Sequence, residues 1–316
     1  LVERARQELA FKVLDRYTGA LVAERAMAVS RETLEAARGN VRLARDRFET
    51  GLAVESDLLQ ARVRESDAEA AVAEAERDAA VARAALNLEL GRALDTAFTL
   101  PDGLPEVAPE ATEPLAALVA RAVEARPDLR AAAARVEAAR AALDGARAGR
   151  RPRLGWSGAF EANAEDPSDD PGSHWSLGLG LTWTGFDGFA TGARIDAARA
   201  RLEEAERLAE LARLGVALEV EAALRGLEVA HLRSREAAEA VALADRSAAI
   251  VQDRYREGLT TVVELLEAEA LLSGARTREL QARREVAVAG GRLALATGGL
   301  TSPRPADRPS IEEPTP

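Results

Sequence analysis

The chain has 316 residues, a net charge of −11 at neutral pH, no cysteine and two histidines. These values exclude disulfides, thiolate chemistry and most zinc sites, and an acidic chain without a basic stripe argues against nucleic-acid binding. Hydrophobic residues make up 47% of the sequence but aromatic residues only 3%. Because alanine supplies much of this apolar content, we expect long, closely packed helices instead of one bulky globular core.

The first part of the chain predicts a pair of helices. Residues 2–48 contain no proline and few glycines, Gly51 interrupts the pattern within RFETGL, and helix is expected again over residues 54–90. The following stretch is rich in proline and glycine, which is typical of an irregular connector. We therefore interpret residues 1–99 as a first helical hairpin and residues 100–114 as a connector.

Residues 115–152 predict two shorter helices that open a second repeat. The second of them begins within RPDLR, where Pro127 suits the first helical turn and Asp128 suits the positive end of the helix dipole. Pro152 ends this helix before the next element begins.

Residues 153–186 predict a β-hairpin with two different faces. Over 153–163 and again over 175–184, large apolar residues alternate with small or polar ones, so one face of each arm is apolar. About 10 residues is the length that a tilted strand needs to cross a bilayer. All three tryptophans lie near the ends of these arms, as an interfacial aromatic girdle requires. The predicted membrane girdle consists of Trp156, Phe160, Trp175, Trp183 and Phe186.

The alternative for this hairpin is a half-buried sheet packed on a soluble core. The surrounding chain offers no other sheet, and an isolated hairpin is marginal in water. Within a membrane, open sheet edges would leave backbone groups unsatisfied, so the strands must belong to a closed barrel. Two strands cannot close a barrel, and other chains would have to supply the rest.

Residues 187–299 predict a second helical hairpin. Its first helix, over residues 190–257, would be about 100 Å long, and its second, over 261–296, about 54 Å. Gly258 separates them. The polar, proline-rich residues 300–316 predict a disordered tail. No apolar run is long enough for a transmembrane helix.

The two helical hairpins are copies of an internal repeat. RFETGL at residues 47–52 matches RYREGL at residues 254–259, an offset of 207 that also brings Asp57 onto Glu264. Shifted back by this offset, the β-hairpin and the helix before it would fall ahead of residue 1. We therefore expect that the first copy has lost its own strand pair and leading helix in this sequence.

Taken together, these features resemble the TolC-like outer-membrane efflux protein family. The resemblance rests on residues 126–154, on the second strand running into WTGFDG, and on both turn segments, RFETGLAVESDLLQA and RYREGLTTVVELLEAE. It implies a mainly α fold with a membrane β-hairpin, in which long antiparallel helical hairpins form an α-barrel tunnel. The strands would join a transmembrane β-barrel shared by a homotrimer. Thr184 stands where the family usually has proline.

The resemblance also implies a location and a function. The protein would lie in the outer membrane of a Gram-negative-type cell, in contact with its lipid, with most of the chain in the periplasm. It would be the outer-membrane channel component of a tripartite efflux or type I secretion system, a passive gated export duct. Its partners would be a periplasmic adaptor (membrane fusion) protein and an inner-membrane transporter. The alternative is a soluble periplasmic coiled-coil scaffold or adaptor, which would need compact β domains that this sequence does not offer.

The turns between the long helices, which we call the tips, are the predicted gate. Glycine accepts positive φ where a helix reverses, although an ordinary turn glycine explains the same residue. In a trimer the acidic side chains beside the tips would form rings that favour cations and basic partner groups, whereas a solvated helix end is the plainer interpretation. The resemblance implies that Tyr255 helps to hold the aperture shut, and a family member has arginine where this chain has Thr260. The predicted gate residues are Phe48, Gly51, Ser56, Asp57, Tyr255, Gly258, Thr260, Glu264 and Glu267.

The sequence predicts no enzyme and no cofactor. It shows no Ser/His/Asp grouping, no glycine-rich phosphate loop and no EF-hand spacing. His174 and His231 are isolated from each other in the predicted elements, so neither is interpreted as a metal ligand. We therefore predict no catalytic, cofactor-binding or metal-binding residue.

Overall fold

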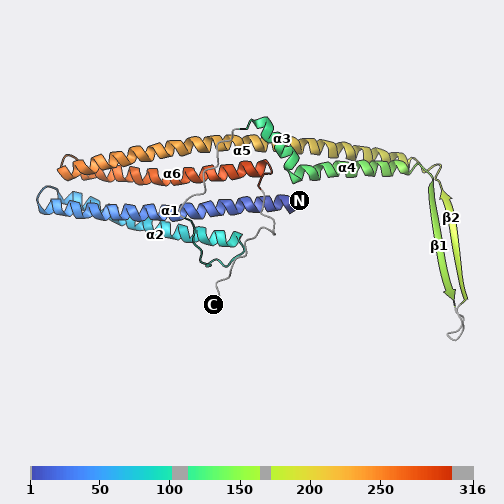
Figure 1. Cartoon of the computed structure of the whole chain (residues 1–316), viewed down its shortest axis with the longest axis horizontal. Helices are drawn as coiled ribbons and strands as arrows, with labels where there is room; N and C mark the ends of the chain where they lie inside the picture. The colour runs from blue at the N-terminus through green and yellow to red at the C-terminus, as the bar shows by residue number, and fades with distance from the viewer. Residues whose placement is uncertain (1, 102–112, 164–171, 301–316) are drawn as a thin grey trace. The chain divides into compact units, whose positions relative to one another are not determined.

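The computed structural model describes residues 2–101, 113–163 and 172–300, which form six helices and one two-stranded sheet. These elements fall into two compact units, Leu1–Pro127 with Val216–Pro316, and Asp128–Gly215. Figure 1 shows the elements coloured in chain order. Most of the predicted connector, the loop between the predicted strands and the predicted disordered tail lie outside the described residues.

The first unit contains two helical hairpins. The first consists of α1 (Val2–Glu49) and α2 (Glu55–Glu89), and the second pairs α6 (Val262–Ala296) with the later part of α5 (Ala190–Glu257). Helix α1 packs against both α2 and α6, so the two hairpins lie side by side (Figure 1). The short helix α3 (Leu115–Ala125) belongs to the same unit. The helices predicted from the sequence agree with these bounds to within one or two residues.

Each hairpin is held by small side chains along its inner seam. In the first, Val41 and Ala44 of α1 pack against Leu58 and Ala61 of α2. Ala44 is completely buried, because a methyl side chain lets two helix backbones approach closely. Such contacts bury little area each, so the stability of the hairpin is distributed along its whole length.

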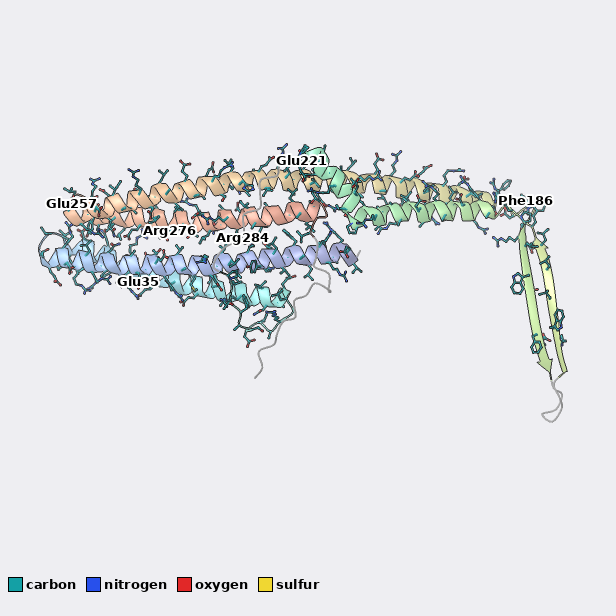
Figure 2. The ribbon with its side chains drawn as sticks, in the orientation of Figure 1. Glu35, Phe186, Glu221, Glu257, Arg276 and Arg284 are labelled. Atoms are coloured by element: carbon teal, nitrogen blue, oxygen red, sulfur yellow. The ribbon has the colours of Figure 1, made fainter. Side chains whose placement is uncertain are left out.

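Polar side chains cross the seam between α1 and α6. Arg284 pairs with Asp15 at 2.6 Å, and the amide of Asn40 donates to a carboxylate oxygen of Glu269 at 2.6 Å. Figure 2 shows Arg276 and Arg284 along this seam, where α6 faces α1. These charge-assisted bonds require one relative placement of the helices, which apolar contacts alone do not fix.

The second unit contains α4 (Pro127–Ala148), the early part of α5 and the β-hairpin of β1 (Arg153–Asn163) and β2 (Gly172–Thr182). Leu143 of α4 packs against Ile195 and Ala198 of α5. The helix predicted after Pro127 thus forms and pairs with α5.

The two strands pair in an antiparallel register that separates two faces. Trp156 lies opposite Leu179, and Phe160 lies opposite Trp175. Paired residues project to the same side of a sheet, so all the large apolar side chains of the pair gather on one face, as predicted. The opposite face carries small and polar residues, among them Glu161, which lies opposite His174.

The second strand ends two residues earlier than the sequence predicted. We expected it to continue to Thr184, but β2 ends at Thr182, which lies opposite Arg153. The residue before Arg153 is Pro152, which has no backbone N–H to extend the ladder. Trp183 leaves the sheet, and its indole nitrogen lies 3.4 Å from the carbonyl oxygen of Arg150.

Among the described residues, no helix combines the length and the apolar character needed to cross a membrane.

Candidate functional site

Both tips turn on a glycine with positive φ. Gly51 has a φ of 74° and Gly258 a φ of 79°. After each glycine the next backbone N–H bonds back to the start of the last helical turn, from Leu52 to Arg47 and from Leu259 to Arg254, at 2.8 Å in both. This is the Schellman arrangement, in which glycine adopts the left-handed conformation without a steric penalty. The 207-residue repeat therefore holds in backbone geometry as well as in sequence.

The helices that follow the two tips begin differently. Before α6, the hydroxyl of Thr261 accepts a hydrogen bond of 3.3 Å from the backbone N–H of Glu264. Thr260 donates to the carboxylate of the same glutamate. Before α2, Val54 occupies the capping position and makes no side-chain hydrogen bond. Side-chain capping thus supports the second tip and is missing from the first.

Tyr255 lies at the centre of the contact between the two tips. It is 2% exposed and packs with Val262, Leu265 and Leu266. Its hydroxyl makes no hydrogen bond to any described residue. The role of Tyr255 in closing the aperture stays a prediction.

Arg47 of α1 makes the contact with Tyr255 instead. Its guanidinium lies 4.9 Å from the centre of the tyrosine ring and donates to the tyrosine carbonyl oxygen. The same group lies 3.4 Å from the carbonyl of Leu52 in its own turn. A guanidinium can serve both partners because it is planar and carries several donors. Sequence reasoning missed Arg47, although it precedes Phe48 just as Arg254 precedes Tyr255.

The surroundings of Tyr255 disfavour its ionised form. Burial raises the pKa of its phenol, the positive charge of Arg47 opposes that rise, and the negative charge of Asp57 adds to it. The phenol is therefore neutral at physiological pH. It can act as an apolar ring under the arginine but not as an anion.

The other predicted gate residues lie on the outside of the tips. Phe48 is 41% exposed, in contrast to its repeat equivalent Tyr255. Asp57 is half-buried, and Gly51, Gly258, Ser56, Glu264 and Glu267 are exposed. Among the described residues, no group of three or more acidic or histidine side chains could hold a metal ion.

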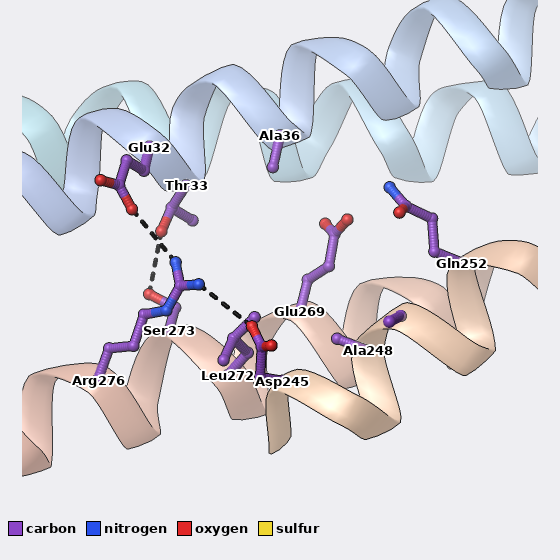
Figure 3. A pocket seen from close by; sticks show the side chains of 11 residues that line it. Glu32, Thr33, Ala36, Asp245, Ala248, Gln252, Glu269, Leu272, Ser273 and Arg276 are labelled. Atoms are coloured by element: carbon purple, nitrogen blue, oxygen red, sulfur yellow. Dashed lines mark hydrogen bonds and ion pairs between the residues drawn. The ribbon is translucent and has the colours of Figure 1, made fainter. Parts of the chain in front are cut away.

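A cavity of about 290 Å³ lies along the shafts, between α1, α5 and α6. Figure 3 shows Arg276 between Glu32 of α1, at 3.2 Å, and Asp245 of α5, at 3.3 Å. Glu269 lines the same cavity, and its pKa is raised by burial, an effect that the hydrogen bond from Asn40 opposes. The sequence did not indicate this cluster, because its members come from three helices with no shared motif.

The predicted girdle residues all lie on the surface of the second unit. Each of Trp156, Phe160, Trp175, Trp183 and Phe186 is between 65% and 78% exposed. A contiguous patch of large exposed apolar side chains marks a surface that interacts with protein or membrane. Phe186 packs edge-to-face on Phe189 with ring centres 5.6 Å apart, beyond the end of β2.

The sequence matches the protein family described as outer membrane efflux protein over residues 2–92 and 118–299. It is 33% identical over 279 residues to protein CyaE of Bordetella pertussis, covering 87% of this chain and 58% of that protein. The chain thus spans a little over half the length of this relative.

Solved structures share the fold. A membrane protein of Pseudomonas aeruginosa has a TM-score of 0.80 at 24% identity, covering 93% of this chain and 69% of its own. The open state of the MtrE outer membrane channel of Neisseria gonorrhoeae has a TM-score of 0.78 at 23% identity, covering 94% and 68%. At such identities the likeness shows the fold alone.

Proposed function

The chain belongs to the outer membrane efflux protein family, and we propose that it forms the outer-membrane channel of a tripartite efflux or type I secretion system. The family, the fold class and the outer-membrane location predicted from the sequence are confirmed by the family match and the shared fold. The transport activity, the trimer and the partners are our proposal.

The observation that carries the proposal is the separation of faces in the β-hairpin. Trp156, Phe160 and Leu179 share one exposed face, and small or polar residues occupy the other. Strands of a transmembrane barrel present this alternation, apolar toward lipid and polar toward the lumen. Lipid cannot form hydrogen bonds with the backbone groups of an open sheet edge. The strand pair therefore belongs in a closed barrel that strands from other copies complete.

The tips form the closed end of the duct in this proposal. Exposed carboxylates on three repeated tip pairs would surround a narrow aperture and select cations. Arg47 would set the position of the second tip relative to the first through Tyr255, and Thr260 would replace a longer gate side chain. A periplasmic adaptor and an inner-membrane transporter would engage the tips, and the transporter would supply the energy.

Ion selectivity in planar bilayers tests this function. Purified protein is expected to form cation-selective pores, because acidic rings raise the local cation concentration. The combined variant Asp57→Asn, Glu264→Gln and Glu267→Gln is expected to move the reversal potential in a salt gradient toward zero.

The matched control exchanges the same residues while keeping their charge, as Asp57→Glu, Glu264→Asp and Glu267→Asp, and should retain the native reversal potential. Pores whose selectivity does not respond to charge removal would contradict the acidic gate. A protein that needs no detergent for extraction and forms no pores would favour the soluble scaffold. The absence of enzymatic activity stays a prediction.

A further inference from the structure

Two short stretches connect the β-hairpin to its helices, and we call them together the joint. They are residues 149–153, from the end of α4 into β1, and residues 183–189, between β2 and α5. The two stretches meet, because the indole nitrogen of Trp183 lies 3.4 Å from the carbonyl oxygen of Arg150 and both residues line a surface cavity of about 290 Å³. Figure 2 shows Phe186, which also lines this cavity, where the helices of the second unit meet the β-hairpin.

The first stretch of the joint is basic, although the chain as a whole is acidic. Residues 145–160 contain four arginines and no acidic residue, whereas the chain carries a net charge of −11. On α4 the exposed Arg147 pairs with Asp144, three residues earlier, at 3.1 Å. No carboxylate lies at such a spacing from the arginines that follow. Three of them are exposed and form no ion pair with any described residue: Arg150, Arg151 and Arg153.

The second stretch presents aromatic rings beside Arg150. Trp183, Phe186 and Phe189 are 65%, 75% and 80% exposed and line the cavity with this arginine. Aromatic rings and the long side chains of basic residues are the groups that suit the boundary of a bilayer, where an apolar part lies against acyl chains and a polar part reaches the headgroups. The joint therefore has the composition of a membrane boundary with an excess of positive charge.

The backbone of Phe189 is held in an unfavourable conformation. Its φ is 68°, and no other non-glycine residue in the described part of the chain has a positive value. A large side chain rarely adopts this conformation, because its Cβ then crowds the backbone. The ring gains no burial in return, since it is largely exposed. Strained residues of this kind cluster at functional sites, and here the strain fixes an aromatic ring at the edge of the cavity.

One carboxylate also lines the cavity, and its partners lie within α5. Asp187 accepts a hydrogen bond of 2.7 Å from the backbone N–H of Thr191 and a second bond from the hydroxyl of the same residue. The hydroxyl bond, followed by the backbone bond and the positive charge of Arg194, lowers the pKa of Asp187. This carboxylate is thus ionised and fixed to the first turn of α5. The charge that remains available to a ligand at the joint is positive.

We propose that the joint binds the phosphate headgroup of an anionic phospholipid in the leaflet of the outer membrane that faces the periplasm. Each strand has 11 residues, enough to cross the apolar part of a bilayer, so the helix side of the hairpin lies at the level of the headgroups. Arg150, Arg151 and Arg153 bind the phosphate oxygens, because a guanidinium can donate two parallel hydrogen bonds to a phosphate. The rings of Phe186 and Phe189 contact the first part of the acyl chains.

The chemistry of the joint favours an anionic lipid over a free anion. Inorganic phosphate would satisfy the arginines but leave three large rings in water, whereas a lipid satisfies both. A zwitterionic headgroup carries its own cation, which offsets its attraction to a basic cluster. This inference rests on the proposed barrel and names the class of lipid that the barrel recognises at its periplasmic end.

Competition between two lipids tests the inference. The purified full-length protein is placed in micelles that contain equal amounts of phosphatidylglycerol and phosphatidylcholine, and native mass spectrometry counts the lipids that stay bound. The native protein is expected to retain phosphatidylglycerol in preference. The triple variant Arg150→Gln, Arg151→Gln and Arg153→Gln is expected to reduce this preference at least about tenfold, because each arginine adds to the attraction for an anionic headgroup.

A matched control removes the same charge from another exposed surface. Arg201, Arg213 and Arg246 of α5 are exposed and form no ion pair with any described residue. Their exchange for glutamine should leave the lipid preference unchanged. An equal loss of preference in both triple variants would show an effect of net charge alone and overturn the inference.

Further outcomes separate the lipid from other ligands and from the proposed function. An amount of inorganic phosphate equal to that of the lipid should not displace phosphatidylglycerol, and displacement would show an anion site that needs no lipid. Equal retention of the two lipids by the native protein also overturns the inference, and the proposed channel then survives if the protein still forms cation-selective pores. A protein that needs no detergent and retains neither lipid overturns both.

A single substitution tests the strained ring independently of charge. Glycine adopts a φ of 68° without a steric penalty, so Phe189→Gly is expected to raise the Tm while it lowers the retention of phosphatidylglycerol. A ring that served only to stabilise the fold would not produce changes in these two directions. Native retention of the lipid in this variant, or a lower Tm, contradicts the role proposed for Phe189.

Discussion

Glu269 is a half-buried carboxylate that makes the stability of the contact between the two repeats depend on pH. It lies half-buried on α6 and accepts a hydrogen bond of 2.6 Å from Asn40 on α1. Burial raises its pKa above the ordinary value, so the folded protein holds this proton more tightly than the unfolded chain does. The stability that protonated Glu269 contributes is fully present below the pKa of this residue in the unfolded chain. It is lost as pH rises through the pKa of this residue in the folded protein.

Replacing Glu269 with glutamine tests this linkage. Gln keeps an oxygen that accepts from Asn40 but cannot ionise. We expect the free energy of unfolding of Glu269→Gln to exceed that of the native protein increasingly as pH rises from about 4 to neutrality. Chemical denaturation followed by circular dichroism at several pH values measures the difference.

The matched comparison uses the donor. Asn40→Ala removes the hydrogen bond that holds the pKa of Glu269 down, so the native dependence on pH should become steeper. That added dependence should vanish in the double variant with Glu269→Gln, since nothing remains to titrate. An added slope that persists in the double variant would show that another group is responsible.

At the scale of an element, the tips depend on backbone conformation more than on packing. Gly258 has a φ of 79°, and a methyl group on it would lie 3.1 Å from a guanidinium nitrogen of Arg47. The left-handed conformation costs a non-glycine residue about 1–2 kcal/mol. Gly258→Ala is therefore expected to lower the free energy of unfolding by about that amount, measured by denaturant titration.

A glycine within a helix supplies the opposite expectation. Gly226 lies in α5, where a methyl group added to it would meet no atom within 4 Å, and alanine is favoured over glycine inside a helix by about 0.5–1 kcal/mol. Gly226→Ala should thus raise stability where Gly258→Ala lowers it. Changes of the same sign in both variants would refute the role assigned to the left-handed turn.

Features that depend on local backbone conformation could be predicted from the sequence, and features that depend on packing between elements could not. Helix ends were predictable, because Gly51, Gly258 and Pro152 act locally on the backbone. The faces of the β-hairpin followed from strict alternation. The contact of Arg47 with Tyr255 was not predictable, since it joins side chains 208 residues apart and depends on how two hairpins pack. The early end of β2 could not be predicted from the alternation of residues within β2. It depends on Pro152, next to the partner strand, which has no backbone N–H to extend the ladder.

At the scale of the whole molecule, two kinds of apolar surface are exposed among the residues that the structure describes. The β-hairpin exposes an apolar face, and the helical hairpins expose apolar side chains on α2 and α5, among them Leu59 and Ile250. Lipid can cover the first, because it offers no hydrogen bonds and the face requires none. The exposed apolar side chains of α2 and α5 lie among charged ones, which suits a protein surface better than lipid. An assembly of several copies in a membrane, as proposed for the channel, would satisfy both.

The orientation of the β-hairpin in a membrane can be measured with a single tryptophan placed on either of its faces. All three tryptophans lie at or beside the β-hairpin, and replacing Trp156, Trp175 and Trp183 with phenylalanine leaves a protein without tryptophan. A new tryptophan at Phe160 would lie on the apolar face, and one at Ala159 on the opposite face at nearly the same position along β1. In the Phe160→Trp variant reconstituted in liposomes, brominated lipid should quench the tryptophan fluorescence, since the side chain would face the acyl chains.

The neighbouring Ala159→Trp variant should respond in the opposite way. Successive strand residues point to opposite faces, so this indole would face the lumen and be quenched by aqueous acrylamide instead. The two sites are adjacent in sequence and so lie at nearly the same depth in the bilayer. A difference in quenching between them therefore reports the face to which each side chain points. Equal access of acrylamide to both indoles would place the hairpin in water and contradict the proposed barrel.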